Sequence, residues 1–124
     1  MTANVETVRR LWSLFAQGRF LDARPLLADT FVADWPVTRE RMSSPELFLQ
    51  AQIEYPGTGT IDVINLVDGG EQVFTQCTVN WNNITFTALS LFRFDSHGKI
   101  NAVTEWWPDE SDPPAGREHL TERY

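Results

Sequence analysis

The chain has 124 residues, 42% of them hydrophobic, and a formal net charge of −7. This length fits one domain with a single core. The acidic excess argues against a partner surface of phosphates, such as nucleic acid or anionic lipid. No window is apolar enough to span a bilayer, and the opening "MTANVETVRR" lacks the pattern of a signal peptide. The sequence therefore predicts a cytoplasmic protein with no nucleic-acid or membrane partner.

Cysteine and histidine are too few for two common kinds of site. Cys77 is the one cysteine, and His97 and His119 are the two histidines. They cannot form an internal disulfide or a ligand cluster of metal-site spacing. Cys77 stands in an alternating strand pattern without a nearby histidine, which favours a small buried apolar residue over a nucleophile. We expect no metal and no cofactor.

Three helices are predicted in the first half of the chain. Apolar residues recur at spacings of three and four over residues 4–17, and Gly18 is a natural stop. Residues 22–28 predict a short second helix, with a proline in its first turn. In "SSPELFLQAQI" a serine cap and a proline at the first turn predict a third helix that ends before Pro56.

The second half changes to a period of two, which is typical of strands. Asp68-Gly69-Gly70, Asn82-Asn83 and Ser96-His97-Gly98 supply the positive backbone angles of tight hairpins. Helices followed by an antiparallel meander predict an α+β fold, with the helices closing one face of a curved sheet. The predicted strands are residues 60–68, 71–81, 84–94 and 99–107, rich in β-branched and aromatic residues.

Three remaining segments complete the single predicted domain, 1–124, whose core spans about 4–107. The stretch "TFVADWPV" predicts a short extended segment, in which Pro36 keeps Trp35 out of helical geometry. The run "RERM", residues 39–42, is interpreted as a solvated loop. The tail, 108–124, is polar with three prolines, and we expect it to be mobile unless it docks on a partner chain.

Two stretches carry a resemblance to a known family. "FTALSLFRFDSHGKI", residues 86–100, runs a Phe-Arg-Phe strand through a turn into Gly-Lys-Ile, and "AQGRFLDARPLLADTFVADWPV", residues 16–37, precedes it. With the element order, they resemble the nuclear transport factor 2-like superfamily, which includes ketosteroid isomerases, SnoaL-like polyketide cyclases and limonene epoxide hydrolase. The resemblance implies a cone, a cystatin-like α+β barrel, in which three helices and a curved antiparallel or mixed sheet surround an apolar cavity. It also implies a homodimer.

The resemblance does not bring the isomerase chemistry with it. That chemistry needs an Asp base, a Tyr and a protonated Asp, and a gapless comparison places Trp35, Leu11 and Ser90 at those positions. The Asp-Arg-Asp constellation of the epoxide hydrolase has no clear counterpart either. The SnoaL-like layout, with an acidic residue and a Trp late in the sheet, points to Glu105 or Asp109 as acid or base.

Glu105 and Asp34 are the two candidate catalytic groups. In a regular strand Glu105 shares a face with Val103 and Trp107. If that face looks into the cone, desolvation raises the pKa of Glu105 towards that of a useful acid or base; if it looks outward, the carboxylate is solvated and inert. A bulge could exchange the faces. Asp34, beside Pro36, is either a second acid or base or a turn carboxylate.

Two functions stay open at this point. The first is a cofactor-independent isomerase, cyclase or hydratase that acts on a small apolar or polyketide-like molecule. The second is a dimeric module that holds a hydrophobic ligand, or a scaffold, without chemistry. Leu89 and Leu91 alternate with Arg93, which indicates an outward apolar stripe and a dimer interface. The candidate ligand-binding residues, several of which we expect to be plain core, are Trp12, Phe15, Trp35, Tyr55, Trp81, Ser90 and Trp106.

Overall fold

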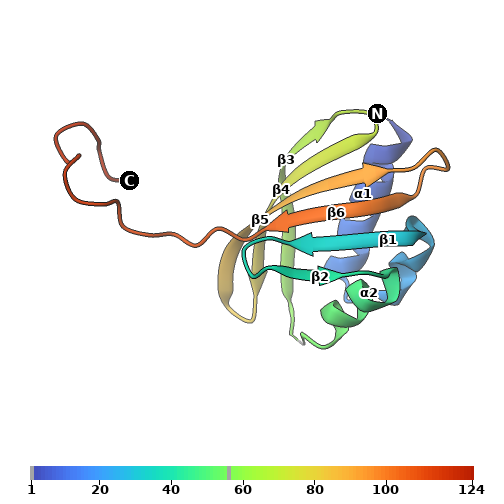
Figure 1. Ribbon diagram of the computed structural model, residues 1–124. Helices are drawn as coiled ribbons and strands as arrows, with labels where there is room; N and C mark the ends of the chain where they lie inside the picture. Colours follow the sequence, from blue (N-terminus) through green and yellow to red (C-terminus); the bar gives the residue numbers. More distant parts are fainter. Residues whose placement is uncertain (1, 56) are drawn as a thin grey trace.

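The computed structural model of the protein describes residues 2–55 and 57–124. Residue 1 of the predicted domain and Pro56, before which the third helix was predicted to end, lie outside these residues. The predicted α+β class is confirmed (Figure 1). In chain order the elements are α1 (Ala3–Ala16), the 3-10 helix η1 (Leu21–Leu26), β1 (Leu27–Trp35), β2 (Glu40–Met42), α2 (Pro45–Ile53), β3 (Gly59–Asp68), β4 (Gln72–Trp81), β5 (Ile84–Phe94) and β6 (Ile100–Trp106).

The six strands form one curved sheet in the order β2-β1-β6-β5-β4-β3. Strands β3 to β6 make the predicted antiparallel meander, whereas β1 runs parallel to β6. The sheet curls around α1, and both α-helices lie on its inner side (Figure 1). Strands β2 and β3 are the two edges of the sheet, and each has a strand partner on one side. The cone is therefore open and does not close into a barrel.

Each α-helix begins at a side-chain cap. The Thr2 hydroxyl accepts a hydrogen bond from the Val5 N–H, and the Ser44 hydroxyl accepts one from the Leu47 N–H. Gly18 follows α1 with a φ of 71°, in the left-handed region that ends helices. The apolar stripe of α1 is buried against the sheet and consists of Val5, Val8, Leu11, Trp12, Leu14 and Phe15.

The second predicted helix is a 3-10 helix that ends earlier than expected. Pro25 lies inside it and has no N–H, so the segment cannot continue as an α-helix. The chain enters β1 at Leu27, three residues before the predicted extended segment.

The prediction of a solvated loop at residues 39–42 is wrong in part. Arg39 turns the chain with a φ of 59°, and residues 40–42 form β2, which pairs antiparallel with β1. Met42 is buried at the end of β2, so its side chain gives this short edge strand an anchor in the core.

The turns that were predicted from sequence are confirmed and set the strand register. Gly70, Asn82, Asn83 and Gly98 all have positive φ values. The two asparagines join β4 to β5 directly, with Trp81 opposite Ile84. Register shifts interrupt the β3–β4, β5–β6 and β1–β6 pairs, and such irregularities increase the bend of a sheet.

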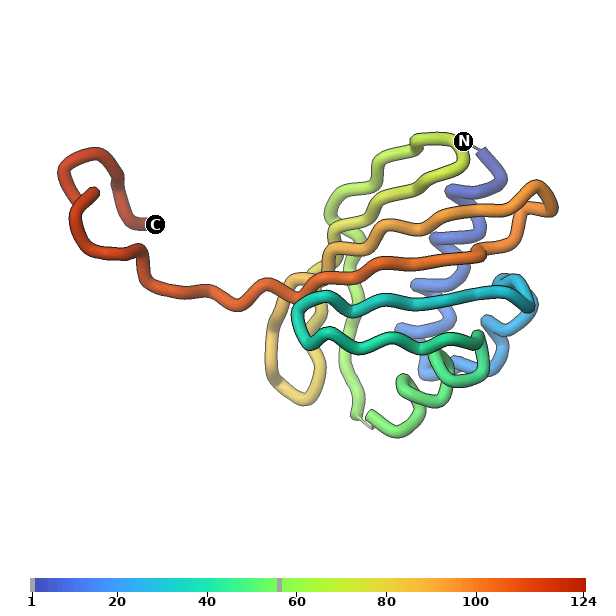
Figure 2. The backbone as a smooth tube through the Cα atoms, in the orientation of Figure 1, coloured from blue at the N-terminus to red at the C-terminus, as the bar shows by residue number. Residues whose placement is uncertain are grey.

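The core fills the space between the inner face of the sheet and the helices, with Phe31, Phe48 and Phe92 among its largest buried side chains. After β6 the chain leaves this body as an arm, residues 108–124, which runs away from the sheet and curls back on itself at its end (Figure 2). Across residues 2–55 and 57–124, none of the helices has the length and apolar character needed to cross a membrane.

Candidate functional site

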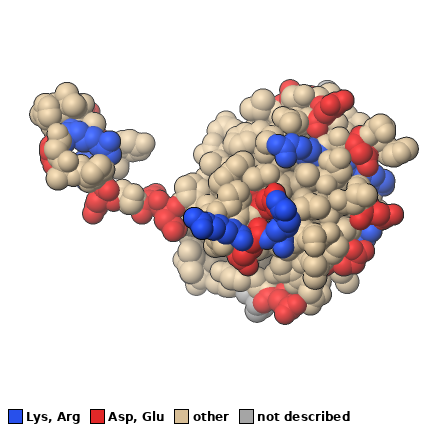
Figure 3. Space-filling view, in the orientation of Figure 1, with Lys and Arg blue, Asp and Glu red and all other residues tan. Residues whose placement is uncertain are grey.

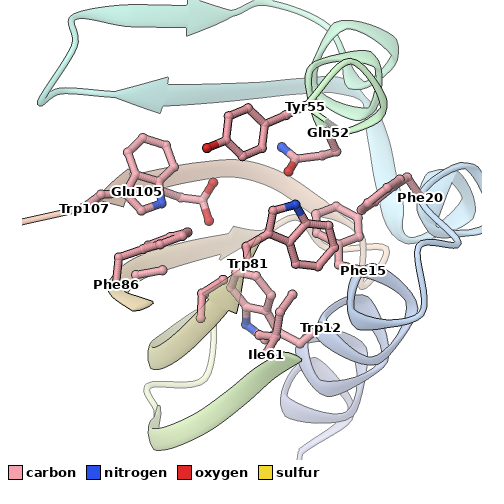
Figure 4. A pocket seen from close by; sticks show the side chains of 12 residues that line it. Trp12, Phe15, Phe20, Gln52, Tyr55, Ile61, Trp81, Phe86, Glu105 and Trp107 are labelled. Carbon is pink, nitrogen blue, oxygen red and sulfur yellow. The ribbon is translucent and has the colours of Figure 1, made fainter. Parts of the chain in front are cut away.

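A cavity of about 100 Å³ lies between the inner face of the sheet and the helices. Its wall is aromatic and aliphatic, with polar groups from Glu105, Gln52 and Tyr55 (Figure 4). Strand β6 contributes Glu105, and the end of α2 and the residues after it contribute Gln52 and Tyr55. The cavity is therefore an apolar site with a small number of polar groups, which is the usual form of a small-molecule pocket.

Strand register places Glu105 between two hydrogen-bond donors. Ser90 on β5 is its direct partner across the antiparallel pair, and the Ser90 hydroxyl donates to Oε2 of Glu105 at 2.7 Å. On the other side β1 is parallel to β6, with Asp34 beside Thr104, so Trp35 lies next to Glu105. The Trp35 Nε1–H donates to Oε1 of Glu105 at 3.1 Å.

Burial controls the protonation of Glu105. The residue is 5% exposed, and loss of water raises the pKa of its carboxyl above the ordinary value. The hydrogen bonds from Ser90 and Trp35 act in the opposite direction but are weaker than desolvation. No ion pair within the described part of the chain involves Glu105. The result is a carboxyl whose pKa is shifted towards neutrality inside an apolar cavity, a state suited to proton transfer.

Three further polar groups face the same space. The Tyr55 hydroxyl points across the cavity towards the Glu105 carboxyl, and the Gln52 amide lies on the same side (Figure 4). The Trp81 Nε1 atom is buried and has no hydrogen-bond partner among residues 2–55 and 57–124. A buried N–H of this kind favours an acceptor atom, and a ligand oxygen could supply one.

The structure separates the predicted ligand-binding residues into three groups. Trp12, Phe15, Tyr55 and Trp81 line the cavity, and the Trp12 Nε1–H donates to Oγ1 of Thr75 at 3.1 Å. Trp35 and Ser90 are not in the cavity wall but hold Glu105 from the neighbouring strands. Trp106 is half-buried on the outer face, because consecutive strand residues point to opposite sides.

Asp34 lies outside the cavity wall, one residue before Trp35 and on the opposite face of β1. Its two carboxylate oxygens accept hydrogen bonds from Arg41 at 2.6 and 3.2 Å. These bonds hold the pKa of Asp34 below its ordinary value. The carboxylate is therefore ionised and paired at neutral pH, a state that suits a structural role better than proton transfer in the cavity.

Several residues of the cavity wall were not predicted from the sequence. Gln52 and Phe86 line the wall, together with Phe20, Ile61 and Trp107. Gln52 could have been found, because it lies four residues after the buried Phe48 on the same face of α2. Phe86 precedes the buried Ala88 by two residues, so it shares the inner face of β5.

Cys77 is fully buried, as predicted, and burial raises the pKa of its thiol to about 11. Within the described residues, no group of three or more His, Cys, Asp or Glu side chains is arranged to hold a metal ion.

No model of a known protein family matches this sequence, and no curated protein is detectably similar to it. Solved structures do match its fold. A provisionally assigned ketosteroid isomerase from Kribbella flavida is 24% identical, with a TM-score of 0.90 over 98% of this chain and 90% of that one.

Two other crystal structures extend the comparison. A nuclear transport factor 2-like protein of unknown function from Burkholderia xenovorans is 20% identical, with a TM-score of 0.81 over 98% of this chain and 95% of that one. A SnoaL-like polyketide cyclase assigned provisionally in Shewanella putrefaciens is 4% identical, with a TM-score of 0.76 over 86% of this chain and 90% of that one. The open cone of this chain is therefore the fold of the nuclear transport factor 2-like superfamily.

Proposed function

We propose that the protein binds a small, largely apolar molecule in its cavity and transfers a proton to or from it through Glu105, without a cofactor. The observation that supports this proposal is the buried carboxyl, held at both oxygens by Ser90 and Trp35 and facing an apolar space. Structures of the same fold include provisionally assigned isomerases and cyclases, but one fold hosts many reactions. The assignment rests on Glu105 and its surroundings.

The size of the cavity narrows the ligand. Pockets that hold drug-sized molecules usually enclose roughly 300–1,000 Å³, against about 100 Å³ here. The volume favours a compact molecule over a polyketide. The polar groups favour one that carries an oxygen, because the Tyr55 hydroxyl can donate to it and the Trp81 Nε1–H has no acceptor among residues 2–55 and 57–124.

A neutral ketone illustrates the chemistry. The Glu105 carboxylate removes a proton from the carbon beside the carbonyl, the C–H electron pair moves into the C–C bond, and the carbonyl oxygen becomes an enolate. Tyr55 or Trp81 would donate a hydrogen bond to that oxygen. In a β,γ-unsaturated ketone, return of the proton from Glu105 to the γ carbon moves the double bond and gives isomerisation. In a molecule with a second carbonyl, attack of the enolate carbon on that carbonyl closes a ring, and the alkoxide that forms takes the proton back from Glu105. Both steps need a base of raised pKa, which burial provides at Glu105.

A non-catalytic binding module is the second candidate. Both Glu105 oxygens already accept hydrogen bonds from the protein, and such bonds can fix a carboxyl as part of the wall. In that case the cavity selects a ligand by shape and by one hydrogen bond, and no proton is transferred.

Proton exchange tests the two candidates without knowledge of the substrate. The protein is incubated in D2O with cyclopentanone or acetophenone, and loss of the protons next to the carbonyl is followed by proton NMR. Binding is followed in parallel through the indole N–H signals of Trp81 and Trp35 in the 15N-labelled protein. Glu105→Gln is the test variant, and Asp34→Asn is the matched control, because it also removes one carboxylate but outside the cavity.

The outcomes separate the candidates. Exchange that is fast with the wild type and Asp34→Asn and falls at least a hundredfold in Glu105→Gln supports the catalytic proposal. Binding at the tryptophan signals without exchange overturns it in favour of the binding module. If neither ketone shifts either signal, the cavity does not bind these neutral ketones, which contradicts a simple ketone as its ligand.

We also propose that the protein forms a homodimer through the outer face of the sheet. Cross-strand partners place Val67, Phe74 and Leu91 side by side on that face, and Val67 is 58% exposed. Apolar side chains that meet no core elsewhere are typical of a surface that is covered in an assembly. Light scattering at high concentration tests the proposal, and a monomeric mass contradicts it.

A further inference from the structure

Within residues 2–55 and 57–124, the arm, residues 108–124, makes no hydrogen bond or ion pair with the body of its own chain. In the described chain, each of its hydrogen bonds and its one ion pair, between Arg123 and Asp112, joins two residues within the arm. Every residue of the arm is exposed, and its apolar side chains Leu120 and Tyr124 lie in solvent. Figure 2 shows the arm extending away from the sheet. A surface that covers Leu120 and Tyr124 would therefore belong to another chain.

The match to two of the crystal structures extends over most of the residues of the arm. The Kribbella and Burkholderia structures each match 98% of this chain, which leaves only two or three of the 124 residues unmatched and so includes most of the arm. The Shewanella structure matches 86% of it, which is the share of the body alone.

The outer face of the sheet has the properties of that surface. Seen from this side, the body shows few charged side chains over β5, β6 and β1, and those present gather near the turn between β1 and β2 (Figure 3). Half-buried Leu89, Leu91 and Trp106 lie on this face, where cross-strand pairing makes Leu89 the neighbour of Trp106. The arm leaves the body at the end of β6, beside the same β1–β2 turn (Figure 1).

The charges of the arm and of the outer sheet face indicate which part of the arm lies near the arginines of that face. The arm carries five carboxylates against two arginines, and three of the carboxylates fall within residues 109–112. Near the β1–β2 turn, Arg41 is paired with Asp34, whereas Arg39 forms no ion pair within the described residues. Arg93 lies near the end of β5, opposite Ala102, and also forms no ion pair within the described residues, although its charge acts on Asp34. An acidic arm and a sheet face that carries Arg39, Arg41 and Arg93 are complementary in charge.

We infer that the arm docks on the outer sheet face of a second copy of this chain, with its acidic residues 109–112 near Arg39 and Arg93 of that copy. This inference rests on the homodimer proposed above and gives it an interface. A two-fold axis makes the exchange reciprocal, so each copy gives one arm and receives one. The 17 residues reach up to roughly 55 Å when extended, enough to cross a body of about 35 Å. Leu120 and Tyr124 then lie against the apolar side chains of the partner's sheet.

Sedimentation velocity tests the arm through the dimer dissociation constant. One variant ends at Pro108; it keeps every helix, strand and core residue, so the body is expected to fold. A second variant, Asp109→Lys/Glu110→Lys, reverses charge in the full-length arm, and a third, Arg39→Glu/Arg93→Glu, reverses it on the proposed receiving face. The matched control is Glu6→Lys/Glu71→Lys, which reverses two exposed carboxylates away from that face.

We expect truncation to raise the dissociation constant at least tenfold. Each charge-reversed variant should raise it several-fold, their combination should restore dimerisation, and the control should match the wild type. If truncation and charge reversal leave the constant unchanged in a dimeric wild type, the arm inference is overturned and the dimer stands. A wild type that stays monomeric overturns both.

A spin label locates the docked arm independently. Leu120→Cys, labelled at that thiol, is mixed with 15N-labelled wild-type chain, whose own Cys77 is buried. Broadening of the amide signals of Leu89 and Leu91 in the isotope-labelled copy is the expected result. Broadening confined to α1 or α2 would place the arm on the other side of the partner and overturn the proposed surface.

Discussion

Ser90 Oγ lies 2.7 Å from Oε2 of Glu105, and the two residues are direct partners across β5 and β6. Both are buried, at 0% and 5% exposure. The hydroxyl stabilises the ionised carboxyl, because a donor favours the charged form of an acid. Ser90 therefore opposes the rise in the pKa of Glu105 that burial causes.

Ser90→Ala removes this donor and should raise the pKa of Glu105 further. We also expect the free energy of unfolding near pH 7 to fall by about 1 kcal/mol, the usual contribution of one hydrogen bond. Titration of the 13C-labelled carboxyl by NMR measures the pKa, and urea unfolding measures the stability. Ser43→Ala, which changes an exposed serine, is the control. A lower pKa in Ser90→Ala would show that the hydroxyl does not act as a donor to the charged form.

Glu105→Gln should make the protein more stable relative to the wild type as the pH rises. Burial raises the pKa of Glu105 in the folded state above its ordinary value of 4.5. Between pH 4.5 and the raised pKa of the folded state, the folded chain binds more protons than the unfolded chain. The stability that Glu105 contributes to the wild type is therefore present at lower pH and is lost as the pH rises through the folded-state pKa. The glutamine has no such proton to lose.

Urea unfolding at a series of pH values from 4 to 8 measures this difference. The stability of Glu105→Gln minus that of the wild type should increase across the window and become constant above the folded pKa. Because other titrating carboxylates are common to both proteins, they cancel in the difference. A difference that is the same at every pH would mean that Glu105 titrates normally and is not the buried acid described here.

The inward orientation of Glu105 was within reach of the sequence, but its hydrogen-bond partners were not. Strand alternation places Glu105 on one face with Val103 and Trp107, and the structure has that face inward. The pairing with Ser90 depends on a β5–β6 register that a bulge shifts. The pairing with Trp35 depends on a parallel contact between strands 70 residues apart, which no local turn specifies.

The turns and strands likewise divide into those that local sequence determines and those that depend on distant contacts. The Asn82-Asn83 turn joins adjacent strands, so two residues of local sequence fix the whole β4–β5 pair. Strand β2 was missed because its stability comes from Met42 in the core and from the β1 neighbour, and neither leaves a periodic pattern in three residues. Gapless comparison placed Trp35 and Ser90 at two lost isomerase positions; both turn out to hold the carboxyl of the strand between them.

Asp34→Asn should have little effect on either the cavity or the fold. Asp34 forms a surface ion pair with Arg41, whose side chain is 68% exposed, and such pairs contribute less than about 1 kcal/mol. We expect an unchanged pKa for Glu105 and a loss of stability within that limit. Carboxyl NMR and urea unfolding of Asp34→Asn measure both quantities. A shift in the Glu105 titration would show an electrostatic link between the two faces of β1.

Cys77 should be inert in the folded protein. Its side chain is fully buried, and burial raises the pKa of the thiol to about 11, so neither access nor the thiolate needed for reaction is available at pH 8. We expect no reaction with a disulfide reagent such as DTNB over minutes in buffer and one thiol per chain in 8 M urea. Leu120→Cys, which adds an exposed thiol in the arm, is the control for reagent access. Rapid labelling of the wild type in buffer would mean that β4 opens readily towards solvent, and with it the wall of the cavity that Val79 and Trp81 provide.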